Sequence, residues 1–400
     1  MKRLFMYELK KLVIRRIVLV SMVLSILLIL ITVGAALLGS YYVNGERIGS
    51  NYQMFQMDKV YQKALTGRPV DGVLLQEMQE AYGKVPLDEE KYSQTEEYEK
   101  YARPYSAIFN YVRQTTGLSG TEIINWTADT EDLRTKRLER QALGWESFQL
   151  TETEKAYWRA LEEKLENPVI FQYAEGYSVL LSSLYTIGLL SLFVVTICLA
   201  GVFPEEHLRR MDQLILSSRW GRGEICWAKF LAGMLFAFLM TLVFVLFTFG
   251  AVFLLYGGEG FDAAFQLLYP NSSCPISVGQ AVIIGYGMVL FAGVFMGALV
   301  MLLSEVLHSS VGTLAITIGI ILLLMFFTMP DEYRLLAQLW SYIPSDFVAC
   351  WSIFSERTVV MLGRVFLAWQ VVPVLYSVLG LGFAFMTKKV FVKYQVRGRN

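Results

Sequence analysis

The residues best suited to form a binding surface lie in one short charged stretch, EEHLRRMDQLILSSRWGRGE, which runs from Glu205 to Glu224. Written as a helix, its apolar residues recur at spacings of three and four and share one face. Charged side chains occupy the other face, and two acids stand in the first turn, where the helix dipole favours anions. The pattern predicts a helix that lies flat on a membrane surface with its charges towards a partner. The alternative is an ordinary solvated connector.

No pattern in the sequence supports catalysis, a cofactor or a metal. The phosphate-binding motif GxxxxGK[ST] is absent, so we expect no ATP hydrolysis by this chain itself. The two histidines, His207 and His308, have no companion at metal-ligand spacing. None of the four cysteines belongs to a C-x-x-C pair, and the sequence leaves open whether Cys274 and Cys350 form a disulfide. We therefore predict a protein that is not an enzyme and uses no cofactor.

The composition indicates an integral membrane protein. Of the 400 residues, 55% are hydrophobic and 18% are charged, with a formal net charge of zero, which is outside the usual range for soluble domains. The balanced charge also argues against a nucleic-acid partner, because a phosphate-binding surface would show a basic excess. Six uncharged stretches are long enough to cross about 30 Å of hydrocarbon as helices. They are Ile17–Leu38, Tyr177–Phe203, Phe230–Tyr256, Val278–Leu303, Ser309–Met329 and Val365–Thr387.

Basic residues near the two ends of the chain predict the topology. Lysines and arginines cluster before the first span, between Lys2 and Arg16, and after the last span, between Lys388 and Arg399. By the positive-inside rule, both termini face the cytoplasm. The first stretch is too long for the core of a signal peptide, so we interpret it as a retained span.

The predicted fold is an all-α integral membrane protein with six transmembrane helices and a helical extracellular domain between the first and second. Residues 1–38 form the cytoplasmic N-terminus and first span, residues 39–176 the outer domain, and residues 177–400 a five-helix membrane region. In the outer domain, helix-forming segments alternate with Gly, Pro and Asn breaks, and no strand pattern is evident. We expect helices at Gln53–Leu65, Val73–Tyr82, Ser106–Val112, Leu133–Leu143 and Thr153–Leu165, the fourth capped by Asp129 or Thr130.

Residues 330–364 form a second kind of outer segment, apolar and aromatic but interrupted at Pro344. Two short helices joined by a break fit either a re-entrant hairpin or a helix pair lying in the membrane interface. Within the spans no ionisable residue occupies an interior position, and we expect Glu305, at the inner end of the fourth span, to be hydrated. The spacing Gly293-x-x-x-Gly297 predicts close approach of another helix.

The stretch from the second span to the third carries four short motifs in order. They are F-x-E-E from Phe203, L-I-L-S-S from Leu214, G-R-x-E-I from Gly221 and A-K-F from Ala228. In these motifs the chain resembles the cytoplasmic loop of ABC-2 type permeases, the membrane subunits of one class of ABC exporters. In that family the loop carries a coupling helix, here within residues 204–229, that seats in a groove of the ATPase subunit. The resemblance implies ATPase-coupling roles for Glu205, Glu206, Arg209, Arg210, Asp212, Arg222 and Glu224.

The resemblance further implies a permease subunit of an ATP-driven exporter in the bacterial plasma membrane. Its partners would be a separate ABC ATPase (nucleotide-binding) subunit, a second permease chain in a homo- or heterodimer, and membrane lipid. The apolar spans favour an amphipathic, peptide or lipid-like substrate. The alternative is a multi-pass receptor or sensor with a ligand-binding outer domain. An intramembrane enzyme would need a buried polar cluster at membrane depth, which the spans lack.

Overall fold

The computed structural model describes residues 2–87, 91–126, 129–205 and 223–393. The chain divides into two compact units. The first, which we call the membrane unit, comprises Met1–Thr32, Ser182–Gly250 and Ile284–Asn400. The second, the insertion unit, comprises Val33–Leu181 and Ala251–Ile283. Each unit is described separately below.

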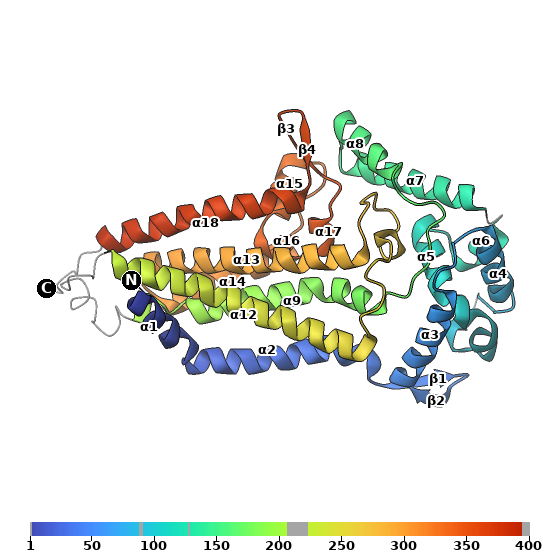
Figure 1. The fold of residues 1–400 in the computed structure, drawn as a ribbon, viewed down its shortest axis with the longest axis horizontal. Helices are drawn as coiled ribbons and strands as arrows, with labels where there is room; N and C mark the ends of the chain where they lie inside the picture. The colour runs from blue at the N-terminus through green and yellow to red at the C-terminus, as the bar shows by residue number, and fades with distance from the viewer. Residues whose placement is uncertain (1, 88–90, 127–128, 206–222, 394–400) are drawn as a thin grey trace. The chain divides into compact units, whose positions relative to one another are not determined.

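Long apolar helices build the membrane unit (Figure 1). Among the described residues, five helical segments are long and apolar enough to cross a membrane: Arg16–Leu37, Glu175–Leu199, Glu224–Tyr256, Val278–Leu307 and Ala368–Lys393. They correspond to α2 (Arg16–Gly34, extended by the 3-10 turn Ala35–Leu37), α9, α12, α13 and α18. The protein is therefore a multi-pass membrane protein. All five coincide with predicted spans.

The predicted fifth span, Ser309–Met329, corresponds to a shorter helix. This helix, α14, runs over Ser310–Phe326 and has 17 residues, or about 26 Å of rise. Ser309 caps it, because its side chain accepts a hydrogen bond from the Gly312 backbone N–H. The predicted span extends over Phe327, Thr328 and Met329, which lie beyond the carboxyl end of the helix.

Helices α12 and α13 pack closely where two glycines lie on α13, as their spacing predicts. A Cβ atom on Gly293 would lie 2.5 Å from Thr241 Oγ1, and one on Gly297 would lie 3.0 Å from Ala237 Cβ. Real Cβ atoms do not tolerate the first distance, so the bare backbone at Gly293 is what allows Thr241 of α12 to approach. The prediction of close packing at this motif is confirmed.

The segment at residues 330–364 holds three short helices and a hairpin: α15 (Arg334–Ser341), α16 (Pro344–Phe347), α17 (Cys350–Ile353), β3 (Val359–Met361) and β4 (Arg364–Phe366). One side of this segment packs against α9 and α18 of the membrane unit. Val348 fills the space in front of Gly188 on α9, and the Tyr376 hydroxyl of α18 donates to the Tyr342 carbonyl at 2.8 Å. The predicted break at Pro344 separates α15 from α16.

The insertion unit is mostly helical: α3 (Asn51–Leu65), α4 (Gly72–Tyr82), α5 (Ser106–Thr116), α6 (Gly120–Asn125), α7 (Thr130–Ser147) and α8 (Glu152–Glu162). Its core gathers buried side chains of α4 and α5, and the Tyr82 ring stacks on Phe109 with centroids 3.9 Å apart. All five helices predicted for this region are present. Asp129 caps α7, which confirms one of the two predicted caps.

Two β-hairpins contradict a strictly all-α fold. Strand β1 (Ser40–Val43) pairs with β2 (Glu46–Ser50), and β3 pairs with β4, both antiparallel. The first turns at Asn44 and Gly45, both with positive φ, and the second at Leu362 and Gly363, also positive. Two-residue turns of this kind match the twist of the flanking strands, and Asn-Gly is their strongest sequence signal. The first hairpin carries this Asn-Gly signal, but its strands are only four and five residues long and were not predicted.

Replacing Gly293 with alanine should destabilise the membrane unit by about 1–3 kcal/mol, since the new methyl group must displace Thr241. The apparent melting temperature of the purified protein in mild detergent measures the effect. Gly250→Ala, on α12, is the matched control, because nothing lies within 4 Å of the Cβ position there. Equal melting temperatures for the two variants would show that the close packing at Gly293 does not hold.

Candidate functional site

The predicted coupling residues lie around the connector between α9 and α12. Of these, Glu206, Arg209, Arg210, Asp212 and Arg222 fall in residues 206–222, outside the described residues. Glu205 follows α9 by six residues, and Glu224 is the first residue of α12. The structure therefore describes both ends of the connector, and the contacts at those ends define what the connector is attached to.

The first end is held by an ion pair with the N-terminal region. Arg15, at the joint between α1 (Lys2–Val13) and α2, donates to the Glu205 carboxylate at 3.0 Å. The Arg15 side chain is 13% exposed and that of Glu205 38% exposed. Glu205 was predicted to face a partner protein, and in the structure its carboxylate has an intramolecular partner 190 residues away.

The second end is held by a deeper ion pair. Lys229, in the second turn of α12, donates to the Glu8 carboxylate of α1 at 2.9 Å, and its side chain is completely inaccessible to solvent. Glu8 is the one acid before Glu46 in a strongly basic N-terminal stretch. That isolation was the available signal, since a single acid among many bases is well placed to neutralise a buried lysine.

Glu305 is buried too, with no solvent-accessible surface. The expectation that this residue is hydrated was wrong. Helix α13 continues to Leu307, so Glu305 lies inside the helix, two residues before its end. A buried carboxylate is tolerated only with compensating charges or hydrogen-bond donors.

The two ion pairs connect the region around the connector to the N-terminal part of the chain. The connector between α9 and α12 has one ion pair just before it and another just after it, and both lead to α1 and the α1–α2 joint. The N-terminal region is therefore in contact with both described ends of the connector, at Glu205 and at Lys229.

Lys229→Met should lower the free energy of unfolding of the membrane unit by about 3 kcal/mol, because it removes the partner of Glu8 from a site closed to water. The charge exchange Glu8→Lys with Lys229→Glu should recover part of that loss. Lys63→Met, which breaks the exposed pair with Glu259, is the control and should change little. Denaturant titration in detergent measures all three, and a Lys229 variant as stable as the control would contradict the buried pair.

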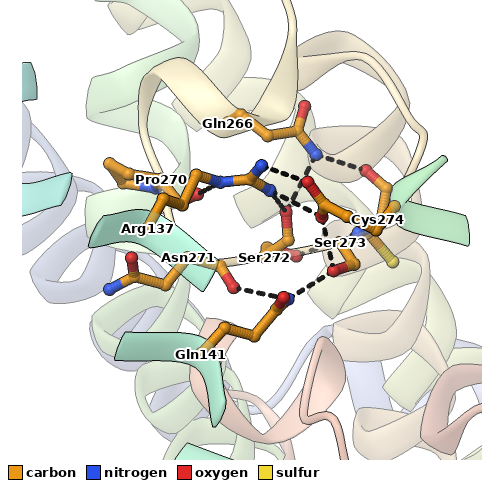
Figure 2. Close-up of polar contacts among 9 residues, drawn as sticks. Arg137, Gln141, Gln266, Pro270, Asn271, Ser272, Ser273 and Cys274 are labelled. Atoms are coloured by element: carbon orange, nitrogen blue, oxygen red, sulfur yellow. Dashed lines mark hydrogen bonds and ion pairs between the residues drawn. The ribbon is translucent and has the colours of Figure 1, made fainter. Parts of the chain in front are cut away.

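The insertion unit contains a second polar cluster, which ties α7 and α8 to residues 270–274. Figure 2 shows the contacts from α7. Arg137 donates to Glu162 through both terminal nitrogens, and also to the carbonyl groups of Pro270 and Ser272. Glu162 in turn accepts from the buried Ser273 hydroxyl at 2.8 Å. Figure 2 shows Arg137 pointing into the turn of this segment. One guanidinium therefore joins two helices and a loop.

Two amides complete the cluster. Gln141 donates to the Asn271 carbonyl at 3.2 Å and to Ser273 Oγ, while Gln266 donates to the carbonyls of Ser272 and Cys274 at 3.0 and 2.8 Å. Burial raises the pKa of the nearby Tyr111 phenol, and the Arg137 guanidinium opposes that shift. The interaction pattern is structural, since each donor meets a carbonyl or carboxylate of the protein. All four cysteines of the chain, Cys274 and Cys350 included, are buried as thiols.

Arg137→Met should destabilise the insertion unit by about 3–5 kcal/mol, because Glu162 would keep a buried charge without its guanidinium. Limited proteolysis should then cut within residues 257–277 much faster than in the unaltered protein. Glu152→Gln breaks the exposed Lys155 pair and should leave the cutting rate unchanged. If the Arg137 variant resists protease as well as that control, the cluster does not hold the loop.

The long apolar helices define a multi-pass membrane protein whose charged connector has an ion pair at each described end. A family model described as ABC-2 family transporter protein matches residues 4–331. The chain therefore belongs to the ABC-2 transporter family, as the resemblance in the connector implied. It is a membrane component of an ABC-2 type transporter, a transport subunit without catalytic activity of its own. No curated protein and no solved structure matches the chain.

Proposed function

We propose that this chain is the permease subunit of an exporter in which a separate ABC ATPase docks on the connector at residues 204–229. The family implies an ABC ATPase partner. Docking at this place is supported by the two ion pairs that anchor the connector, Arg15 with Glu205 and Glu8 with Lys229. ATP-driven closure of the ATPase would push the connector, and the anchored helix ends would tilt together.

The proposed topology has six crossings, with α14 as the fifth. The start of α1 and the end of α18 lie at the same end of the membrane unit (Figure 1). Chain ends on one side require an even number of crossings, and the five long helices reach that number only with α14. At about 26 Å this helix is short of a core of about 30 Å, a mismatch that local thinning can absorb. Basic residues at both ends then place that side in the cytoplasm.

In this topology the insertion unit lies outside the cell, and the plasma membrane of a bacterium is the proposed location. A second copy or a related permease chain would complete the translocation path. In the described spans, ionisable residues lie only near the helix ends, such as Glu175, Lys229 and Glu305. A path without central charges suits an amphipathic, peptide or lipid-like substrate better than an ion.

A receptor or sensor with a ligand-binding insertion unit is the alternative function. The family match speaks against it, because ABC-2 members transport. The ion pair between Glu8 of α1 and Lys229 of α12 also speaks against a receptor. A receptor whose spans only anchor an outer domain does not need such a contact beside the connector.

Charge reversal in the connector tests the proposal. Arg209→Glu with Arg210→Glu should lower the amount of ATPase subunit that co-purifies in mild detergent at least about tenfold, since the charge that the connector offers to its partner would be reversed. The matched control is Arg47→Glu with Lys91→Glu, two exposed residues of the insertion unit. Undiminished co-purification with the Arg209 and Arg210 variant would show that the ATPase docks elsewhere.

A further inference from the structure

A large apolar cavity lies on the membrane unit between α12, α13 and α18, which run side by side in Figure 1. Its volume is about 540 Å³, within the range of sites that hold a small molecule. Aromatic rings supply much of the lining: Trp227, Phe230 and Phe238 of α12, Phe291 and Phe295 of α13, and Tyr376 of α18. The cavity is separate from the connector contacts and from the insertion unit.

The lining has little to offer a polar occupant. The Tyr376 hydroxyl already donates to the Tyr342 carbonyl at 2.8 Å, and the Ser377 hydroxyl donates to the Pro373 carbonyl at 2.7 Å. The remaining lining side chains are hydrocarbon, aromatic, Met or Gly. The part of an occupant that lies inside the cavity must therefore be apolar, and it is held there mainly by van der Waals packing against the lining.

The cavity has the length of one membrane leaflet. Along α12 it extends from Trp227 to Phe238, and along α13 from Gly287 to Ala298, about 16 Å of helical rise in each case. Half of the hydrocarbon core is roughly 15 Å. The rim side chains Leu231, Phe291 and Leu381 are 47%, 44% and 62% exposed, so the cavity opens sideways to the bilayer and not to water.

A cation stands at the end of the cavity where α12 begins and α18 ends. Lys388 Nζ lies 5.6 Å from the centroid of the Trp227 ring, and Trp227 lines the cavity. Across residues 2–87, 91–126, 129–205 and 223–393, no carboxylate forms an ion pair with Lys388. A tryptophan and a lysine at the end of a span are the side chains that meet lipid headgroups.

We propose that this cavity binds one anionic phospholipid, with an acyl chain between α12, α13 and α18 and its phosphate beside Lys388. The proposal concerns a lipid bound at this site and does not depend on what the protein transports, so it stands whether or not the connector docks an ATPase. The charge of the lipid complements Lys388, and the leaflet-length apolar cavity accepts its tail.

Native mass spectrometry of the purified full-length protein tests the proposal, with phosphatidylglycerol and phosphatidylcholine of identical acyl chains added in separate titrations. The unaltered protein should retain one phosphatidylglycerol in preference to phosphatidylcholine. Lys388→Gln should weaken phosphatidylglycerol retention roughly fivefold, the effect of one lysine near the membrane surface. It should leave phosphatidylcholine retention nearly unchanged.

Cavity-filling variants test the acyl-chain part. A side chain at Gly287 has nothing within 4 Å of its Cβ position, and at Gly380 the nearest atom is Ala298 Cβ at 4.0 Å. Gly287→Leu and Gly380→Leu should therefore fold and abolish retention of both lipids. The matched controls are Gly382→Leu, on the same helix with open space in front of it and outside the cavity, and Lys389→Gln, the exposed neighbour of Lys388.

Three results would overturn the proposal. Lipid retention unaffected by both cavity-filling variants would mean that the cavity holds no lipid. Equal losses of phosphatidylglycerol retention for Lys388→Gln and Lys389→Gln would mean that positive charge at this end of the membrane unit attracts the lipid without a specific site. The same spectra also report dimers. A dimer that is present in the unaltered protein and lost in Gly287→Leu would mean that a second copy of the chain covers the cavity.

Discussion

The buried ion pair between Glu8 and Lys229 is the contact on which the arrangement of the membrane unit depends. A bilayer accepts a helix because the helix satisfies its own backbone groups, but it accepts a charge only if that charge is paired or reaches the headgroups. Lys229 reaches neither water nor headgroups by itself, since its side chain has no exposed surface. Helix α1 must therefore lie against the start of α12, and that position in turn brings Arg15 to Glu205.

The same principle operates with different residues in the insertion unit. Arg137 and Glu162 are nearly buried, and the loop at residues 270–274 wraps around them so that its carbonyl groups accept the remaining guanidinium hydrogens. A loop that approaches a helix pair in this way gains specificity from directional bonds, whereas an apolar contact would allow it to slide. In both units, then, a single buried cation fixes the relative position of segments that are more than 100 residues apart in sequence.

Structural features that depend on runs of neighbouring residues could be predicted from the sequence. Uncharged stretches of more than twenty residues located the long spans, and the Gly293 spacing predicted the close approach of α12 to α13, because both are local patterns with a direct physical meaning. Pairings between distant residues carry no such pattern. Glu8 stands out as the one acid of a basic N-terminal stretch, but that isolation names no partner. Nothing near Arg137 points to Ser272 either, so the candidate site was predicted as a connector but not as an anchored one. The β1–β2 hairpin is a different case, since Asn44-Gly45 was readable and was overlooked.

The first six residues of α12 include three residues discussed above. Glu224 follows the connector, Trp227 lines the cavity, and Lys229 forms an ion pair with Glu8 of α1. On a helix, residues two apart face different directions, so Trp227 can face the cavity while Lys229 faces α1. A ligand in the cavity can influence movement of this helix only if its free energy of binding differs between the positions that α12 adopts. Trp227 and Lys229 stand on the same helix, so a tilt of α12 would move both a wall of the cavity and the contact with α1. A lipid tail that fits better at one cavity width would then favour one position of the helix.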